Sequence, residues 1–179
     1  MVYKDGSSES GWETTPPTKA ATAGLRFFMD LSGNKGLLDR HLVAFFASRT
    51  SPPEALDLAR QWAHEIVKTD KVVISGFHSP IERAVLEILL AHKCSIVVAL
   101  GRSLYRNIPE YLRMAHSENR VLFVSFRDLS RQNRSSSQMR NWCVADMAED
   151  TVLAPYSSSS QLSTLHHYLL GGSKRVSIL

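Results

Sequence analysis

Apolar residues gather in short runs along the 179-residue chain, and from His41 onward these runs alternate with helical patterns. The runs are rich in β-branched and aromatic residues and mostly do not alternate with polar ones, which is typical of strands covered on both faces of a parallel sheet. The pattern therefore predicts strands over Leu42 to Ala47, Val72 to Ser75, Ser95 to Leu100, Val121 to Phe126, Thr151 to Tyr156 and Arg175 to Leu179.

The segments between these runs carry apolar residues at helical spacing, as in Leu56, Ala59, Trp62 and Ala63. Six strands with five intervening helices predict an α/β fold, a doubly wound, mostly parallel sheet of about six strands with helices on both faces. Residues 1–22 are dominated by Gly, Ser, Thr and Pro without periodicity, so we expect a disordered leader there. Residues 23–179 are expected to form a single domain.

A small polar residue followed three positions later by Glu or Gln comes after each of the first five predicted strands, which is the capping-box pattern of a helix N-terminus. The five pairs are Ser51 and Glu54, Ser79 and Glu82, Asn107 and Glu110, Ser135 and Gln138, and Ser158 and Gln161. Ligands of parallel sheets bind beyond the carboxyl ends of the strands, where helix N-termini attract phosphate. The pattern predicts an anion-binding rim, but it does not distinguish a nucleotide from a sugar phosphate or a DNA backbone.

Composition adds a modest net charge of +4 and argues against several other classes of protein. No apolar stretch is long enough to span a bilayer, and the N-terminus lacks a secretory signal pattern. Cys94 and Cys143 lie far apart, which favours a reducing cytoplasm over a disulfide framework or a zinc site. No pair of histidines has metal-ligand spacing with a third ligand nearby, so we expect no bound metal and no cofactor.

Arginine is concentrated in one part of the chain. Between positions 102 and 140 there are eight arginines, three acidic residues and no lysine. Guanidinium groups bind phosphate bidentately and stack on bases, so this segment favours nucleic acid as a partner, the alternative being a solvated surface with helix-end charges. Tyr105, Tyr111 and Phe126 are candidate stacking faces, although Phe126 ends a strand and also fits the core.

The loop after the second predicted strand, Gly76 to Glu82, holds further candidates. Gly76 suits either a sharp turn or the close approach of a phosphate. His78 is either a solvated loop residue or a ligand contact, whereas capping accounts for Glu82. The serines at 157–160 fit a flexible turn and a phosphate-binding loop equally well.

Four segments together resemble the Rossmann-like domain of the DNA-processing protein A family, also called Smf, over roughly Leu37 to Leu179. They are Ala44 to Ile66, Val72 to Glu82, Ser95 to Glu110 and Met139 to Ser160. This resemblance implies single-stranded DNA binding through the strand-end loops, recombinase loading and dimerisation.

Motif by motif, Ser48-Arg49 matches the family's Ser/Thr-Arg pair, Ser75-Gly76 its Ser-Gly, and Arg140-Asn141 its Arg-Asn. The segment from Ser158 to Gln161 lies near its Ser-Gly-Ser-Leu loop. The chain departs from the family where the signature's Ala-Arg-Gly is replaced by His78-Ser79-Pro80, so the signature arginine is missing.

The same superfamily includes phosphoribohydrolases, which carry a Pro-Gly-Gly-x-Gly-Thr loop followed by a catalytic Glu. The comparable loop here is serine-rich and has Gln161 instead, so we predict that the chain is not an enzyme.

We therefore expect a cytoplasmic, homodimeric protein that binds single-stranded DNA or another nucleic acid in DNA processing, uptake and recombination. The alternatives are a nucleotide-binding sensor, a vestigial nucleoside-monophosphate phosphoribohydrolase, or an interaction scaffold. The candidate binding residues are Ser48, Arg49, Ser75, Gly76, His78, Arg102, Arg127, Arg131, Arg134, Arg140, Asn141, Ser158, Ser159 and Ser160.

Overall fold

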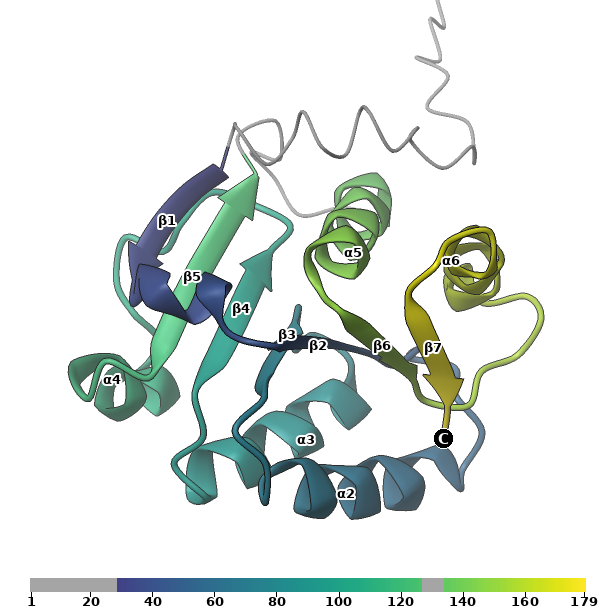
Figure 1. The fold of residues 1–179 in the computed structure, drawn as a ribbon, viewed down its shortest axis with the longest axis horizontal. Coiled ribbons are helices and arrows are strands. Elements are labelled where there is room, and N and C mark those ends of the chain that lie inside the picture. The colour runs from purple at the N-terminus through teal and green to yellow at the C-terminus, as the bar shows by residue number, and fades with distance from the viewer. Residues whose placement is uncertain (1–28, 127–133) are drawn as a thin grey trace, which may run out of the picture.

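The computed structural model describes residues 29–126 and 134–179, whose strands form one seven-stranded sheet of order β1-β5-β4-β3-β2-β6-β7 (Figure 1). The strands are β1 Met29–Gly33, β2 Leu42–Phe46, β3 Val72–Ser75, β4 Ile96–Leu100, β5 Val121–Phe126, β6 Asp150–Leu153 and β7 Arg175–Ile178. The helices are η2 Lys35–Asp39, α2 Ala55–Ile66, α3 Pro80–Ala91, α4 Glu110–Ser117, α5 Arg134–Met147 and α6 Gln161–Leu170. The predicted doubly wound α/β fold is confirmed, whereas the leader predicted over residues 1–22 lies outside the described residues.

The sheet contains one strand more than the pattern predicts. β2 to β7 pair in parallel, and β1 pairs antiparallel with β5, with Met29 opposite Phe126. The expected count of about six strands missed β1, because the segment Met29–Gly33 alternates apolar and polar residues and is only half-buried at the sheet edge. An antiparallel edge strand lacks the continuous apolar run that marks the buried strands β2 to β5.

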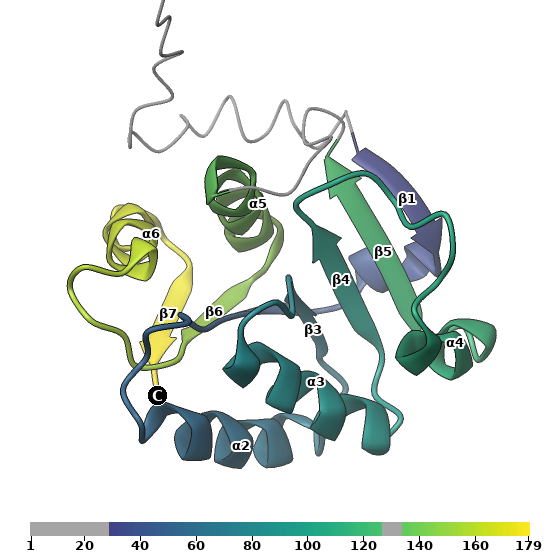
Figure 2. The ribbon, with the colours of Figure 1, turned by 180° about the vertical axis from the view of Figure 1, so that it is seen from behind.

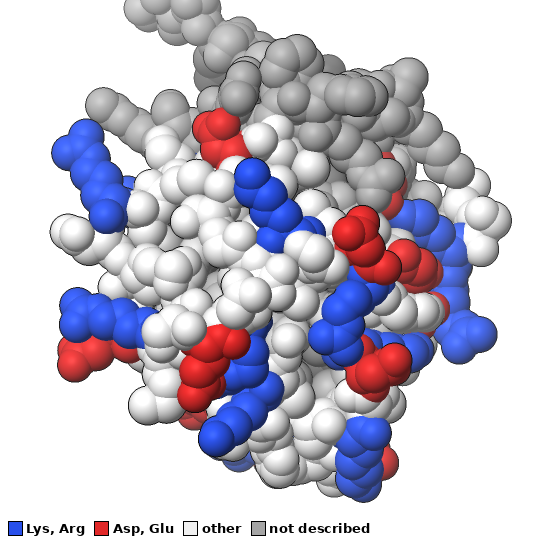
Figure 3. Space-filling view, turned by 60° about the vertical axis from the view of Figure 1, so that its left-hand side comes forward, with Lys and Arg blue, Asp and Glu red and all other residues white. Residues whose placement is uncertain are grey.

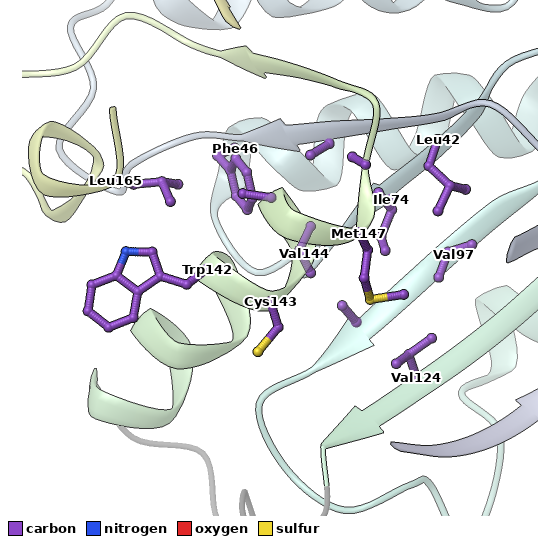
Figure 4. Packing of buried hydrophobic residues seen from close by; sticks show 14 of the residues in the cluster. Leu42, Phe46, Ile74, Val97, Val124, Trp142, Cys143, Val144, Met147 and Leu165 are labelled. Atoms are coloured by element: carbon purple, nitrogen blue, oxygen red, sulfur yellow. The ribbon is translucent and has the colours of Figure 1, made fainter. Parts of the chain in front are cut away.

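Helices cover both faces of the sheet, as Figures 1 and 2 show from opposite sides. Side chains of α2, α3 and α4 pack with Phe45, Ile96 and other buried residues on one face. The opposite face holds η2, α5 and α6. There Val144 and Met147 of α5 point toward the side chains of the central strands (Figure 4). Burial on both faces accounts for the continuous apolar runs of β2 to β5, whereas β7 at the sheet edge is mostly exposed.

The predicted capping boxes are correct at one helix out of five. Ser79 Oγ accepts the Glu82 amide at the start of α3, and the Glu82 carboxylate accepts the Ser79 amide. α2 and α4 begin after Glu54 and Pro109 without a side-chain cap, Ser135 lies inside α5, and α6 is capped by Ser160 in place of Ser158.

Local chain stiffness explains two of these differences, because a residue before proline is driven out of the helical conformation. Prolines 52 and 53 place a turn before α2, and Pro109 delays the start of α4. At α6, Ser157 to Ser160 form a turn closed by the Ser160 amide on the Ser157 carbonyl, which moves the cap to Ser160.

The strand order reverses beside β2, which has β3 on one side and β6 on the other. From β2 the chain proceeds through β3 and β4 to β5, and it then returns through α5 to β6 and β7. In open α/β sheets, ligands bind beyond the carboxyl ends of the strands at such a reversal. The loops after β2, β3 and β6 meet at this point and are the place to look for a site.

Two further findings concern the described part of the chain. None of its helices combines the length and the apolar character needed to cross a bilayer. Cys94 and Cys143 are both free thiols, and burial raises the pKa of Cys143 to about 12. Cys143 therefore serves as an apolar side chain of the core.

Candidate functional site

A hollow of about 670 Å³ opens at the carboxyl ends of β2, β3 and β6, beside the first turns of α5. We call it the strand-end hollow. The described residues that line it are Ala47, Ser48, Arg49, Thr50, His78, Ser79, Glu82, Arg134, Ser137, Arg140, Asn141, Ser159, Ser160, Gln161 and Leu162. Its position is that expected of a ligand site at the reversal of strand order.

Arg140 is the deepest cation of the hollow and is only 4% exposed. Its Nε and Nη2 atoms donate to Asn141 Oδ1, at 3.1 and 2.7 Å. Its Nη1 atom is buried and has no hydrogen-bond partner among the described residues. Burial lowers the pKa of Arg140, and the negative charge of Glu82 counteracts that effect. A guanidinium keeps its charge in proteins.

Glu82 also lines the hollow, is buried, and accepts hydrogen bonds from three backbone amides. Its Oε1 accepts from Ala47 N at 3.2 Å, and its Oε2 accepts from His78 N at 2.7 Å and Ser79 N at 3.0 Å. The carboxylate thus joins the loop after β2 to the start of α3 and also balances part of the Arg140 charge. The capping box accounts for the bond to Ser79, and the bonds to His78 and Ala47 go beyond it.

The sequence profile of the DNA recombination-mediator protein A family matches residues 18–167 of the chain. The chain belongs to this family. The resemblance found in the sequence motifs is thereby confirmed, and no relative was found among curated proteins.

Two solved structures of DNA processing protein A share the fold. The Helicobacter pylori protein, described for its single-stranded DNA binding mode, superposes with a TM-score of 0.68 at 18% identity, covering 84% of this chain and 70% of its own. The Streptococcus pneumoniae protein gives a TM-score of 0.59 at 17% identity, covering 83% of this chain. The present chain spans 62% of the length of the latter.

Most of the residues expected from the recombination-mediator family motifs meet in the strand-end hollow. Ser48 and Arg49 come from the loop after β2, Arg140 and Asn141 from α5, and the other predicted residues that line it are His78, Arg134, Ser159 and Ser160. The Ser48 hydroxyl also accepts the Thr50 amide at 3.2 Å, which shapes the loop that carries Arg49. Whether these residues bind a ligand stays a prediction.

Other predicted residues lie elsewhere. Ser75 and Gly76 lie outside the lining, where Ser75 Oγ accepts the Phe77 amide, and Ser158 is also absent from it. Arg102 is exposed after β4 and is not among the lining residues of the hollow, and its carbonyl accepts Ser125 Oγ. Arg127 and Arg131 lie outside the described residues.

Gly76 has a role that neither reading of the sequence named. A Cβ at this position would lie 2.4 Å from Cζ and Nη1 of Arg140, so the glycine leaves room for the guanidinium. The left-handed backbone conformation of the turn belongs to Phe77, with a φ of 51°, whose buried side chain packs on the α2 and α3 side of the sheet. The missing Cβ therefore accommodates a side chain of the protein itself.

The described arginines of the arginine-rich segment do not share one surface. Of its described members, Arg134 and Arg140 line the hollow, while Arg120 pairs with Glu118 beyond the end of α4. Figure 3 brings forward the side of the molecule that carries β1 and α4, where acidic and basic side chains are interspersed. That face fits the reading of a solvated surface.

The predicted stacking residues also lie apart from the lining of the hollow. Tyr105 packs edge-on against Phe123, with ring centroids 5.5 Å apart, and Phe126 belongs to the core. Tyr111 is 62% exposed on α4.

The sequence reasoning did not name Thr50 and Ser137 as binding candidates, and it gave Gln161 a capping position and a place in the comparison with hydrolases; all three line the hollow. Ser137 lies one turn after Arg134 and one turn before Asn141, so helical spacing would have revealed it had α5 been predicted to begin at Arg134.

His78 is half-buried between positive charges from three elements. Burial is the main cause that lowers its pKa, from 6.5 to about 4, followed by the charges of Arg140 on α5, Arg83 on α3 and Arg49 after β2. Its amide is bonded to Glu82, and its Nε2 atom is buried without a partner among the described residues. His78 is therefore neutral at pH 7.

Replacing His78 by Gln is expected to reduce the loss of thermal stability in acid. Between pH 6.5 and about 4 the unfolded chain binds a proton at this position and the folded chain does not, so the contribution present above pH 6.5 is lost as the pH falls. The Tm of the wild type should fall further than that of H78Q over this range. The exposed His167 gives the control H167Q, which should follow the wild type, and parallel curves for H78Q and wild type would refute the assignment.

Proposed function

We propose that the chain binds single-stranded DNA through the strand-end hollow, with successive backbone phosphates on Arg49, Arg134 and Arg140. The observation that carries this proposal is the buried guanidinium of Arg140, whose Nη1 has no partner in the described part of the chain.

Burying a charge is costly unless it is paired and hydrogen-bonded. Glu82 supplies part of the compensation, but its oxygens are occupied by backbone amides. A phosphate entering the hollow would give Arg140 Nη1 an acceptor, and guanidinium–phosphate bonds are among the stronger hydrogen bonds in proteins. Arg49 and Arg134 are exposed and lie where they would hold neighbouring phosphates.

A nucleic-acid backbone fits the lining better than a mononucleotide does. The described residues of the hollow are mainly arginines, serines and amides, and they include the imidazole of His78 but no Phe, Tyr or Trp on which a base would stack. The Helicobacter pylori relative is itself described as binding single-stranded DNA. Binding through phosphates predicts similar affinity for different DNA sequences.

We also propose that the chain acts by binding and not by hydrolysis. Gln161 lines the hollow where related hydrolases would be expected to have a glutamate, and the Glu82 carboxylate already accepts three amides. A recombinase partner is supported by the family's description as a recombination mediator. Homodimerisation is proposed from the resemblance to the family. Light scattering and co-purification with a recombinase would test these two proposals.

Fluorescence anisotropy with a labelled thymidine oligonucleotide tests the proposal directly. Each phosphate neutralised on a single strand contributes about −0.7 to the slope of log affinity against log salt, so three arginines predict a slope of about −2 for a short probe. A mixed-sequence probe should bind equally well. No anisotropy change at low salt would refute DNA binding, and stabilisation of the protein by mononucleotides alone would favour the nucleotide-sensor alternative.

A further inference from the structure

A second hollow lies between α2 and α3 and adjoins the strand-end hollow. Its volume is about 700 Å³. We call it the α2–α3 hollow, and it is lined by Arg49, Leu56, Arg60, His78, Pro80, Ile81, Arg83, Ala84 and Glu87. Arg49 and His78 line both hollows, so a ligand that crosses these two side chains passes from one into the other.

The rim of the α2–α3 hollow is positively charged. Arg49, Arg60 and Arg83 face one acidic residue, Glu87. Arg60 lies 3.6 Å from Asp57, but both side chains are more than half exposed and such pairs contribute little, so Arg60 remains able to bind another anion. The charge of this rim therefore complements a phosphate backbone.

The lining of the α2–α3 hollow differs from that of the strand-end hollow in its apolar part. Leu56, Pro80, Ile81 and Ala84 come from the facing sides of α2 and α3. Apolar side chains next to guanidinium planes are suited to a nucleobase. Moving a base out of water costs little free energy, and a base also stacks on arginine. The strand-end hollow offers hydrogen-bond donors for phosphate groups, and the α2–α3 hollow adds a surface for bases.

We propose that the α2–α3 hollow is a second binding segment for the same single-stranded nucleic acid, which crosses Arg49 and His78 and lays its next nucleotides between α2 and α3. Arg60 and Arg83 bind phosphates there, and the bases lie on the apolar residues. This inference rests on the proposed DNA binding of the strand-end hollow. On this path the bound segment of nucleic acid is longer than either hollow alone accommodates.

Length-dependent binding tests the path. We compare thymidine oligomers of about four and about twelve nucleotides, which bracket the usual site sizes of single-strand binders. The double variant R60Q/R83Q changes two exposed side chains, so it is expected to fold normally. It should bind the short probe as the wild type does, within about twofold, and the long probe about tenfold more weakly, with a salt slope reduced by about 1.4.

A matched double variant controls for net charge. Arg113 on α4 and Arg175 on β7 lie outside both hollows, so R113Q/R175Q should leave both probes unaffected. Wild-type affinity of R60Q/R83Q for the long probe would overturn the second segment and leave the proposed function intact. An equal loss for both probes, or for both double variants, would show general attraction and would also overturn it. Failure of the wild type to bind either probe would refute the proposed function itself.

Discussion

Replacing Arg140 by methionine is expected to weaken single-stranded DNA binding by at least about 30-fold, while the free energy of unfolding changes by about 1 kcal/mol or less. Methionine keeps much of the volume of the side chain and removes the buried charge, whose Nη1 is unpartnered in the described part of the chain. The Glu82 carboxylate left behind still accepts three amides, so its burial remains tolerable. Anisotropy and urea unfolding measure the two effects separately.

Two variants sharpen this test. Replacing Gly76 by alanine places a Cβ 2.4 Å from the guanidinium and forces it to move, so G76A should also weaken binding although Arg140 is still present. R113M removes an exposed arginine of α4 that lies outside both hollows and should bind like the wild type. Affinity of R140M within about twofold of the wild type would contradict the role assigned to Arg140.

Replacing Glu82 by glutamine is expected to lower the free energy of unfolding by about 3 kcal/mol. Both carboxylate oxygens accept backbone amides, and glutamine has only one oxygen. The new NH₂ group would therefore face at least one amide donor from Ala47, His78 or Ser79. The change also removes the negative charge that balances Arg140 in the interior.

The double variant E82Q/R140M separates these two causes. If part of the cost comes from leaving Arg140 uncompensated, the double variant should be less destabilised than the sum of the single variants. Urea denaturation gives all three values, and E65Q, at an exposed glutamate of α2, is the control that should match the wild type. Strict additivity would mean that Glu82 stabilises the fold through its amide bonds alone.

The parallel part of the fold followed from the sequence because buried strands have a direct signature. Continuous apolar runs such as Val121–Phe126 reflect burial on both faces, and their positions agree with the structure. β1 has no such signature, since its half-exposed residues are defined as a strand by pairing with β5, a contact between distant parts of the chain. Helix starts were harder to predict, because prolines and local turns determine at which of several nearby residues a helix begins.

The site was predictable where a motif lies at a strand end and less so where distant residues meet. Ser48-Arg49 and Arg140-Asn141 were found as pairs, and the fold brings both to one hollow. Arg102 was also expected to bind, and the structure places it after β4, outside the residues that line the hollow. The dependence of Arg140 on the missing Cβ of Gly76 joins residues 64 positions apart, and no local pattern indicates it.

β1 has a consequence for the behaviour of the molecule in concentrated solution. It occupies the outer hydrogen-bonding edge of β5, whose six residues, Val-Leu-Phe-Val-Ser-Phe, are all buried. Without it, β5 would present an unpaired row of amides and carbonyls to which the β5 strand of another copy would add, as in aggregation. The segment Met29–Gly33 thus covers the buried strand β5 and leaves a five-residue, half-exposed strand at this edge, and short edge strands of this kind pair less readily with another molecule.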